Sequence, residues 1–485
     1  MPGGLALKAK ARITPAVSDD IRLDPRADEA PDALQEGRLS RAFVAEVAAV
    51  LDSGDDDALR ALVSPLHPAD VADLFAAIAV DARAPLADAL GDVLNAEVIA
   101  ELDDYVREDV LEALSPGEVA EVVTQLDTDD AVAVIEDLEA DDQRAVLRAL
   151  APEDRADIEA ALNYPEESAG RLMQRDLVAV TENMSVGAVI ERIRASIDPA
   201  TDFWEIFVVD IAGRPVGTMR LSWLLTAPPD LMVGDVMKRE QTLIPVAMDQ
   251  EEVALQFQKY ALISAAVVDA YGKLVGVITV DDVVHIIQAE AGEDALKLSG
   301  AGDGDINEPV VESYKARVRW LAANLGTAMI SSSVIALFEP TIEKLVTLAA
   351  LTPIVASIGG NAGTQTMAVA VRAIATKQLT DSNTRRTIWR EVRVAMLNGL
   401  TIAALLGLGV GILFNSINLG GVIAAAALFN IMVAGLAGVL VPLALTRLRT
   451  DPAVASSIFV TMTTDTMGFL GFLGLAALVG VANLQ

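Results

Sequence analysis

The chain has 485 residues, no cysteine and two histidines, His67 and His285. This composition excludes disulfides, thiolate clusters and His-rich zinc or iron sites, so any metal chemistry must use oxygen ligands. Residues 1–314 hold 24 Lys and Arg against 63 Asp and Glu, a net charge of −39, whereas residues 315–485 hold 12 against 6, a net charge of +6. The contrast predicts an acidic soluble half joined to an apolar membrane half.

The first 39 residues are rich in Pro, Ala and charge, which predicts a disordered tail. They contain no apolar core of signal-peptide length. We therefore expect the acidic half to stay in the cytoplasm.

Leucine recurs every twelve residues between positions 90 and 162, at Leu90, Leu102, Leu114, Leu126, Leu138, Leu150 and Leu162. Several of these units begin with turn or cap residues followed by acids, as in "SPGE" (115–118), "DTDD" (127–130) and "APED" (151–154), which is typical of helix N-termini. Each unit reads as one short helix and a turn. Residues 40–162 are thus predicted to form an acidic helical superhelix that buries the leucines between stacked units.

A second repeat follows, because residues 208–225 match residues 267–284. The corresponding positions are Asp210, Gly213 and Gly217 in the first copy and Asp269, Gly272 and Gly276 in the second. Each copy reads as strand, Gly-containing turn, strand and helix, and follows a Met-containing segment. Residues 163–295 resemble a tandem pair of cystathionine-beta-synthase (CBS) modules, a regulatory α/β fold that is often dimeric and often binds nucleotides.

The second copy contains "GVITVDD", which resembles the ribose-binding pattern of such modules. The resemblance makes Thr279 and Asp282 candidates for binding an adenine nucleotide such as ATP. The first copy has Arg220 and Trp223 at the matching positions, so the resemblance to the binding pattern rests on the second copy.

The second half contains five apolar stretches long enough to span a membrane, at residues 318–338, 343–374, 391–414, 420–446 and 453–483. The basic residues gather before the first stretch and in the loops after the second and fourth, whereas the opposite loops carry only Lys344. By the positive-inside rule, the acidic half faces the cytosol and the C-terminus lies outside.

The fifth stretch includes "FVTMTTDTMGFLGF" (459–472), which places Asp465 deep inside the hydrocarbon. A central Asp costs about 2.5–3.5 kcal/mol on insertion scales, so it is expected to face protein or water. Thr461 and Gly468, four and three residues away, share its helix face. The central parts of the other stretches hold no Lys or Arg, which argues against an ion pair. A polar face with an acid is suited to a cation path, to which Thr464 is a further candidate.

The second stretch contains "SIGGNAGTQ" (357–365). Its glycines permit two interpretations: an unwound segment that lines a water-filled cavity, or a close helix crossing through small residues. The sequence leaves both open. In either case Asn361 and Gly363 are candidates to flank the ion path.

An acidic superhelix, a CBS pair and five spans, in this order, resemble the MgtE family of magnesium channels and transporters. The motifs that carry the resemblance are "YPEESAGRLM" (164–173), "ARVRW" (316–320) and "GGNAGTQ" (359–365). The resemblance implies a homodimer with its pore between two copies of the membrane domain (residues 318–485). It also implies cytosolic domains that bind Mg²⁺ and a connecting helix, residues 296–317, that plugs the closed pore.

The resemblance also implies roles for individual carboxylates. Asp465 would bind the hydrated ion, and Asp451, in "DPA", would be a ligand at the cytoplasmic mouth. The implied cytosolic sensor ligands are Asp249, Glu251, Asp282, Glu290, Glu293 and Asp294. Ala261 and His285 stand where relatives can carry acids, and Thr364 replaces an Asn.

The expected function is passive Mg²⁺ uptake through a Mg²⁺-gated channel in the plasma (inner) membrane. Two alternatives stay open: a transporter coupled to protons or sodium, and a nucleotide-responsive membrane receptor without transport. Five spans without an obvious inverted repeat argue mildly against the coupled transporter. No phosphate loop and no catalytic constellation is present, so neither an enzyme nor a nucleic-acid partner is expected.

Overall fold

The computed structural model describes residues 33–35, 38–196, 203–301, 304, 306–380 and 382–480. The chain divides into two compact units, one of residues up to Ala247 with Ala266–Val277, the other of Met248–Ala265 with the chain from Ile278 onward. Most of the predicted disordered tail lies outside the described residues. Its end differs from the prediction, because β1 (Leu34–Gln35) and β2 (Arg38–Leu39) pair as an antiparallel hairpin.

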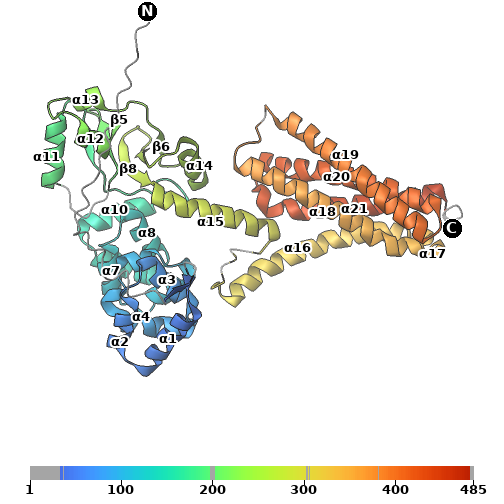
Figure 1. Ribbon diagram of the computed structural model, residues 1–485, viewed down its shortest axis with the longest axis horizontal. Helices are drawn as coiled ribbons and strands as arrows, with labels where there is room; N and C mark the ends of the chain where they lie inside the picture. The colour runs from blue at the N-terminus through green and yellow to red at the C-terminus, as the bar shows by residue number, and fades with distance from the viewer. Residues whose placement is uncertain are drawn as a thin grey trace, which may run out of the picture. The chain divides into compact units, whose positions relative to one another are not determined.

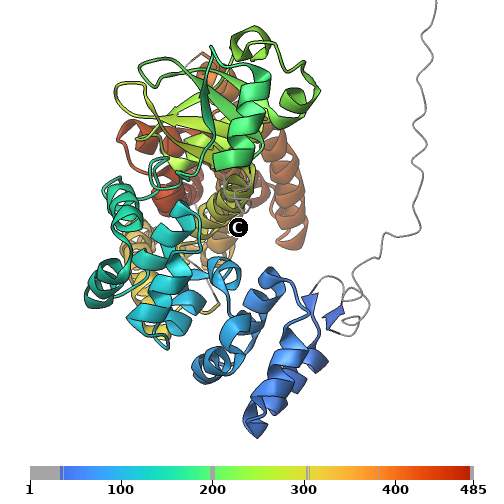
Figure 2. The same cartoon turned by 90° about the vertical axis from the view of Figure 1, so that its left-hand side faces the viewer.

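Short helices follow one another through the predicted superhelix and stack as shown in blue to cyan in Figure 2. They are α1 (Arg41–Ser53), α2 (Asp56–Val63), α3 (Pro68–Ala77), α4 (Val80–Leu90), α5 (Ala96–Ala100), α6 (Asp104–Leu111), α7 (Pro116–Val123), α8 (Thr128–Glu136), α9 (Ala140–Ala149) and α10 (Pro152–Leu162). The repeating leucines are buried or packed against this one core, so the all-helical N domain is confirmed. Ser115 caps α7 through a capping box with Glu118, as "SPGE" predicts.

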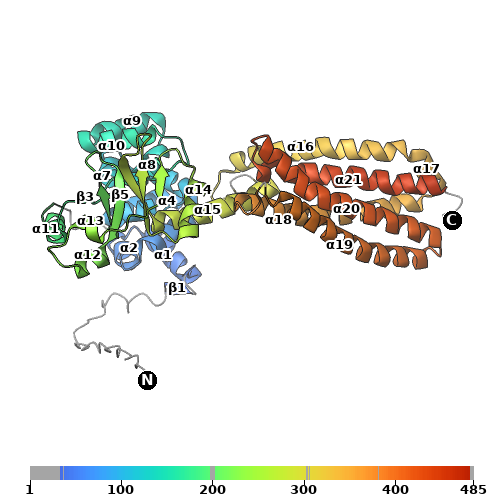
Figure 3. The ribbon, with the colours of Figure 1, turned by 90° about the horizontal axis from the view of Figure 1, so that it is seen from above.

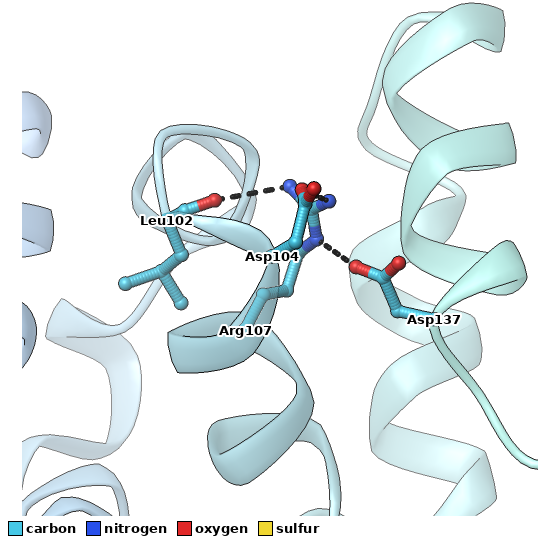
Figure 4. A network of polar contacts seen from close by, with 4 residues as sticks. All are labelled: Leu102, Asp104, Arg107 and Asp137. Carbon is cyan, nitrogen blue, oxygen red and sulfur yellow. Dashed lines mark hydrogen bonds and ion pairs between the residues drawn. The ribbon is translucent and has the colours of Figure 1, made fainter. Parts of the chain in front are cut away.

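Buried arginines join successive layers of the N domain. The Arg107 guanidinium donates to the Leu102 carbonyl at 3.1 Å, to Asp104 at 2.7 Å and to Asp137 at 2.6 Å (Figure 4). Arg83 repeats the arrangement one layer earlier, with hydrogen bonds to the Phe75 carbonyl and to the Asp109 carboxylate. Burial raises the pKa of the Asp137 carboxyl above its ordinary value, and the Arg107 charge opposes that shift.

Two small sheets confirm the predicted CBS pair. The first has the order β3-β4-β5, with β3 (Ala179–Thr181) parallel to β4 (Glu205–Val209) and β4 antiparallel to β5 (Pro215–Arg220). The second has the order β6-β7-β8, with β6 (Leu243–Pro245) parallel to β7 (Ser264–Val268), followed by β8 (Leu274–Thr279). The accompanying helices are α11 (Val186–Ser196), α12 (Leu221–Thr226), α13 (Val233–Val236), α14 (Gln250–Tyr260) and α15 (Val280–Ser299).

The matched residues of the two copies have matched roles. Asp210 and Asp269 each accept two backbone N–H groups at 2.8–2.9 Å, across turns that contain Gly213 and Gly272 at φ +78° and +76°. Such positive φ angles favour glycine. The aspartate and glycine of the repeat therefore build the same tight turn twice.

The C-terminal part is a bundle of long helices that run side by side (Figures 1 and 3). They are α16 (Val310–Leu337), α18 (Thr347–Ala375), α19 (Thr384–Leu413), α20 (Ile417–Arg447) and α21 (Pro452–Val479), with the short α17 (Glu339–Lys344) after α16. Among the described residues, α16, α19, α20 and α21 are long and apolar enough to cross a membrane. The count of five spans is thus not confirmed, because the polar segment 357–366 lowers the apolar character of α18.

The connecting segment differs from the prediction of one helix over residues 296–317. Helix α15 ends at Ser299, where Gly300 caps it at φ +69°, and α16 begins only after Pro309. A left-handed glycine ends a helix, and proline suits the entry to the next one. Residues 310–317 are therefore the first turns of α16, which continues to Leu337.

Replacing Arg107 by alanine should destabilise the N domain by about 3 kcal/mol, because the mostly buried Asp137 carboxylate loses its partner. The measurement is hydrogen exchange of the full chain, resolved for peptides of α6 to α8. The matched control is Arg144→Ala, since Arg144 and its partner Asp141 are 61% and 87% exposed, and such a pair contributes about 0.5 kcal/mol or less. Equal effects of the two changes would contradict a stabilising role for the buried arginine.

Candidate functional site

Helix α21 carries the membrane acid predicted to bind a cation. Asp451 caps its start, with Oδ1 accepting from the Ala453 N–H at 2.7 Å. Further along, Asp465 is half-buried, Thr461 is exposed, and Thr464 is fully buried with its hydroxyl donating to the Thr461 carbonyl at 3.0 Å. Of the predicted polar face, Thr461 and Asp465 are thus accessible, whereas Thr464 packs inside the bundle.

The Asp465 carboxylate has no hydrogen bond or ion pair with any residue that the structure describes. Its neighbour Thr466 shares a hydrogen bond with Ser331 of α16 at 3.0 Å. This bond joins α21 to α16 about 100° around the helix from Asp465. A charge left unpaired at this depth is costly and marks a functional position. Asp465 therefore stays the candidate cation ligand on α21.

Helix α18 stays continuous through the glycine motif, so its backbone is not unwound. Gly363 is buried, and a Cβ atom there would lie 2.7 Å from Val460 Cγ1 and 3.2 Å from Thr464 Cγ2. Asn361 is exposed on the same helix. Of the two interpretations of the motif, the structure bears out the close crossing between α18 and α21.

A buried amide in α20 was missed by the sequence analysis. Asn430 is fully buried, and its Nδ2 donates to the Val355 carbonyl of α18 at 2.9 Å. The signal was present, because Asn430 stands alone in an apolar stretch, as Asp465 does.

A cavity of about 180 Å³ lies among α18, α19 and α20, lined in part by Gln365, Arg390, Glu391 and Asn398. Glu391 is only 6% exposed and pairs with the exposed Arg390. Asp465 does not line this cavity. The charged residues that do, Arg390 and Glu391, neutralise each other. We therefore assign the candidate cation path to the α21 face and not to this cavity.

Four of the predicted sensor carboxylates lie near one another on α14 and α15. Burial raises the pKa of the Glu251 carboxyl, and the charges of Glu290, Asp294 and Asp249 raise it further. Gln250 donates to Glu290 at 2.6 Å, which joins the two helices. Several acids thus act on one carboxyl, against the opposing charge of Lys377, and a cation placed among them would relieve their repulsion.

The sequence analysis also missed a lysine between the sensor helix and the membrane helix. Lys297 Nζ lies 2.5 Å from Glu293 and 3.3 Å from Asp451, so it bridges α15 and the start of α21. These two carboxylates raise the pKa of Lys297, despite opposing desolvation. The spacing of four residues from Glu293 is a sequence signal for the first contact only.

The remaining predicted residues form a local pair. Thr279 donates to Asp282 at 2.7 Å, in the first turn of α15. Within the described part of the chain, no three His, Cys, Asp or Glu side chains are placed to hold a metal ion. The predicted sensor acids are thus gathered in part, without forming a complete ligand set.

Three family models match the chain. Residues 352–475 match MgtE, described as a divalent cation transporter, residues 66–167 match the MgtE intracellular N domain, and residues 233–289 match the CBS domain. The family is one of membrane transporters and not of enzymes.

Relatives whose names are known lead to the same family as the family models. The magnesium transporter MgtE of Thermus thermophilus is 36% identical over 329 residues, covering 67% of this chain and 72% of the relative, and that of Enterococcus faecalis is 32% identical over 322 residues, covering 66% and 71%. A crystal structure of the cytosolic domain of the Mg²⁺ channel MgtE in complex with ATP is 32% identical, covers 50% of this chain and 99% of its own, and has a TM-score of 0.46. This chain, with its N domain, CBS pair and helical membrane part, belongs to the MgtE family of magnesium transporters.

Proposed function

We propose that this chain is a Mg²⁺-gated channel for passive Mg²⁺ uptake, with Asp465 at its ion site. The observation that carries the proposal is the Asp465 carboxylate, which is accessible on α21 and has no partner among the described residues. Family membership supplies the class of substrate. The N domain and CBS pair would lie in the cytoplasm, since the basic residues flank the membrane helices on that side.

The chemistry of Mg²⁺ suits a single acid in each chain. The ion is small, holds its waters tightly and is bound by a few carboxylates instead of a full protein cage. In a homodimer, two Asp465 side chains would face one path and hold the hydrated ion through water. Two charges attract a divalent ion more strongly than a monovalent one, and the incomplete cage lets the ion leave.

Uptake through such a path needs no fuel, but it does need a gate. At about 100 mV, negative inside, moving two charges inward gains about 4.6 kcal/mol. The acids on α14 and α15 provide a sensor, because repulsion among Glu251, Glu290 and Asp294 falls when a divalent ion binds between them. Mg²⁺ would thereby favour the state in which α15 is held against α21, and this closes the mouth at Asp451.

ATP binding at the second CBS module stays a prediction for Thr279 and Asp282. Their mutual hydrogen bond at 2.7 Å supports this prediction, because it brings the two side chains together. When a nucleotide binds, the hydrogen bond between Thr279 and Asp282 would be replaced by hydrogen bonds from these side chains to the ribose hydroxyl groups.

Replacing Asp465 by asparagine keeps the shape and removes the charge, so Mg²⁺ influx into proteoliposomes should fall at least about tenfold, as expected for a loss of about 1.4 kcal/mol or more. Influx is measured at several internal Mg²⁺ concentrations with the proton and sodium gradients collapsed. The matched control is Glu343→Gln on α17, which should leave the rate within about twofold. An undiminished rate for Asp465→Asn would refute the assigned ion site, and a wild-type rate that vanishes with the gradients would favour the coupled transporter.

Replacing Lys297 by alanine should raise influx at the lowest internal Mg²⁺ about two- to fivefold. The reason is that the ion-free closed state loses its bridge between Glu293 and Asp451, and half-exposed pairs contribute about 0.5–1 kcal/mol. Lys259→Ala, on the exposed end of α14, serves as the control. A rate unchanged by Lys297→Ala would show that this contact plays no part in gating.

A further inference from the structure

Asn430 is an unusual group for the middle of a membrane helix. It is fully buried in α20, and one hydrogen bond, to the Val355 carbonyl at 2.9 Å, satisfies its Nδ2. Its Oδ1 is buried and has no hydrogen-bond partner among the described residues. Polar atoms without a partner are expensive away from water, so the position calls for an explanation other than stability.

Two glycines from different helices make room for this amide. A Cβ atom added at Gly359 of α18 would lie 2.0 Å from Asn430 Nδ2, and one added at Gly468 of α21 would lie 2.6 Å from the same atom. Real Cβ atoms do not approach so closely, so neither position accepts a larger residue without a shift. The Asn430 side chain is thus wedged between α18 and α21, in a notch that both helices provide.

The notch lies next to the candidate ion path along both helices. Gly468 follows Asp465 by three residues and therefore shares its helix face. Gly359 precedes Asn361 by two residues on α18. If the Asn430 amide moved, the segment of α21 that carries Asp465 and the segment of α18 that carries Asn361 would rotate or shift.

Helix α21 has a second close contact with α18, about one turn before Gly468. This contact does not decide the rotation of α21, whereas the amide does. Gly363 of α18 packs on Val460 and Thr464 through side-chain carbon atoms alone. Apolar packing of this kind sets the separation of two helices but tolerates rotation, because it has no direction. The hydrogen bond of Asn430 to the Val355 carbonyl has a direction, so it fixes the amide against α18. Helix α21 then meets this fixed amide at Gly468, where only one rotation of α21 leaves room for it.

We propose that Asn430 is a positioning residue for the ion site: its amide, held by the Val355 carbonyl and seated between Gly359 and Gly468, sets the rotation of α21 and so the direction of the Asp465 carboxylate. The inference rests on the proposed function in one respect, namely that Asp465 binds the ion. Asn430 itself does not touch the ion.

The test uses steric clash and its relief in the full-length protein. Gly359→Ala should raise the external Mg²⁺ concentration for half-maximal influx about tenfold, because the new methyl displaces the amide. Adding Asn430→Ala to Gly359→Ala should recover at least half of this loss on a logarithmic scale, because the clashing amide is gone. Gly421→Ala, on α20 with open space at its Cβ, is the control and should stay within twofold.

A second readout follows the rotation of α21 without any ion. The chain has no cysteine, so Thr461→Cys places a single thiol on the exposed side of α21. Its labelling rate by a water-soluble thiol reagent should change at least threefold in Gly359→Ala and return toward the starting rate in the double variant. A substitution that only destabilises the protein would lower the yield of folded protein, but the labelling rate would not change in Gly359→Ala and return in the double variant.

Several outcomes would overturn the proposal. One is that Gly359→Ala behaves like Gly421→Ala, and another is that Asn430→Ala fails to suppress Gly359→Ala in both readouts. If Gly359→Ala alone does not fold, recovery of folded protein in the double variant supports the proposal, and failure of both to fold refutes it. If Asp465→Asn leaves influx intact, the proposed function fails, while the labelling rates still decide the role of Asn430.

Discussion

The membrane part is organised by the need to satisfy polar groups where water is scarce. Ser331 meets Thr466, the Thr464 hydroxyl bonds within its own helix, and Asn430 finds the Val355 carbonyl. Two groups differ among the described residues, because the Asp465 charge and the Asn430 Oδ1 have no partner. The bundle thus satisfies most of these neutral polar groups internally, whereas the Asp465 carboxylate is left accessible on α21.

The soluble part, in contrast, must accommodate an excess of negative charge. In the N domain, buried arginines such as Arg107 neutralise inward acids and join the layers (Figure 4). On α14 and α15, acids crowd around Glu251 and raise its pKa. Burial of an acid beside an arginine gives a rigid scaffold, whereas crowding of several acids gives a place where a divalent ion would change the balance of charge. Carboxylates paired with arginine thus stabilise the N domain, whereas the crowded carboxylates of α14 and α15 form the proposed sensor.

Periodic features were predictable from the sequence, and individual contacts between distant residues were not. The twelve-residue leucine period and the repeated Asp and Gly turns each impose a local geometry, so the N domain and CBS pair could be derived. Asp465 was found because a single charge in an apolar stretch is conspicuous. Lys297 and its contact with Asp451 escaped, because nothing local links residues 154 positions apart. The glycine motif stayed ambiguous, since glycine permits both an unwound and a closely packed helix.

The continuous helix at this motif limits how an ion can be held. In an unbroken helix the backbone carbonyls of residues 357–365 are engaged within the helix and cannot replace the ion's water. Transporters that strip and couple ions commonly use unwound carbonyls at broken helices. Under the proposed function, the oxygen ligands would be side chains such as Asp465, which would reach an ion that keeps its waters. A path of this kind would favour an ion that resists dehydration, as Mg²⁺ does, and would suit the proposed gated channel better than a coupled carrier.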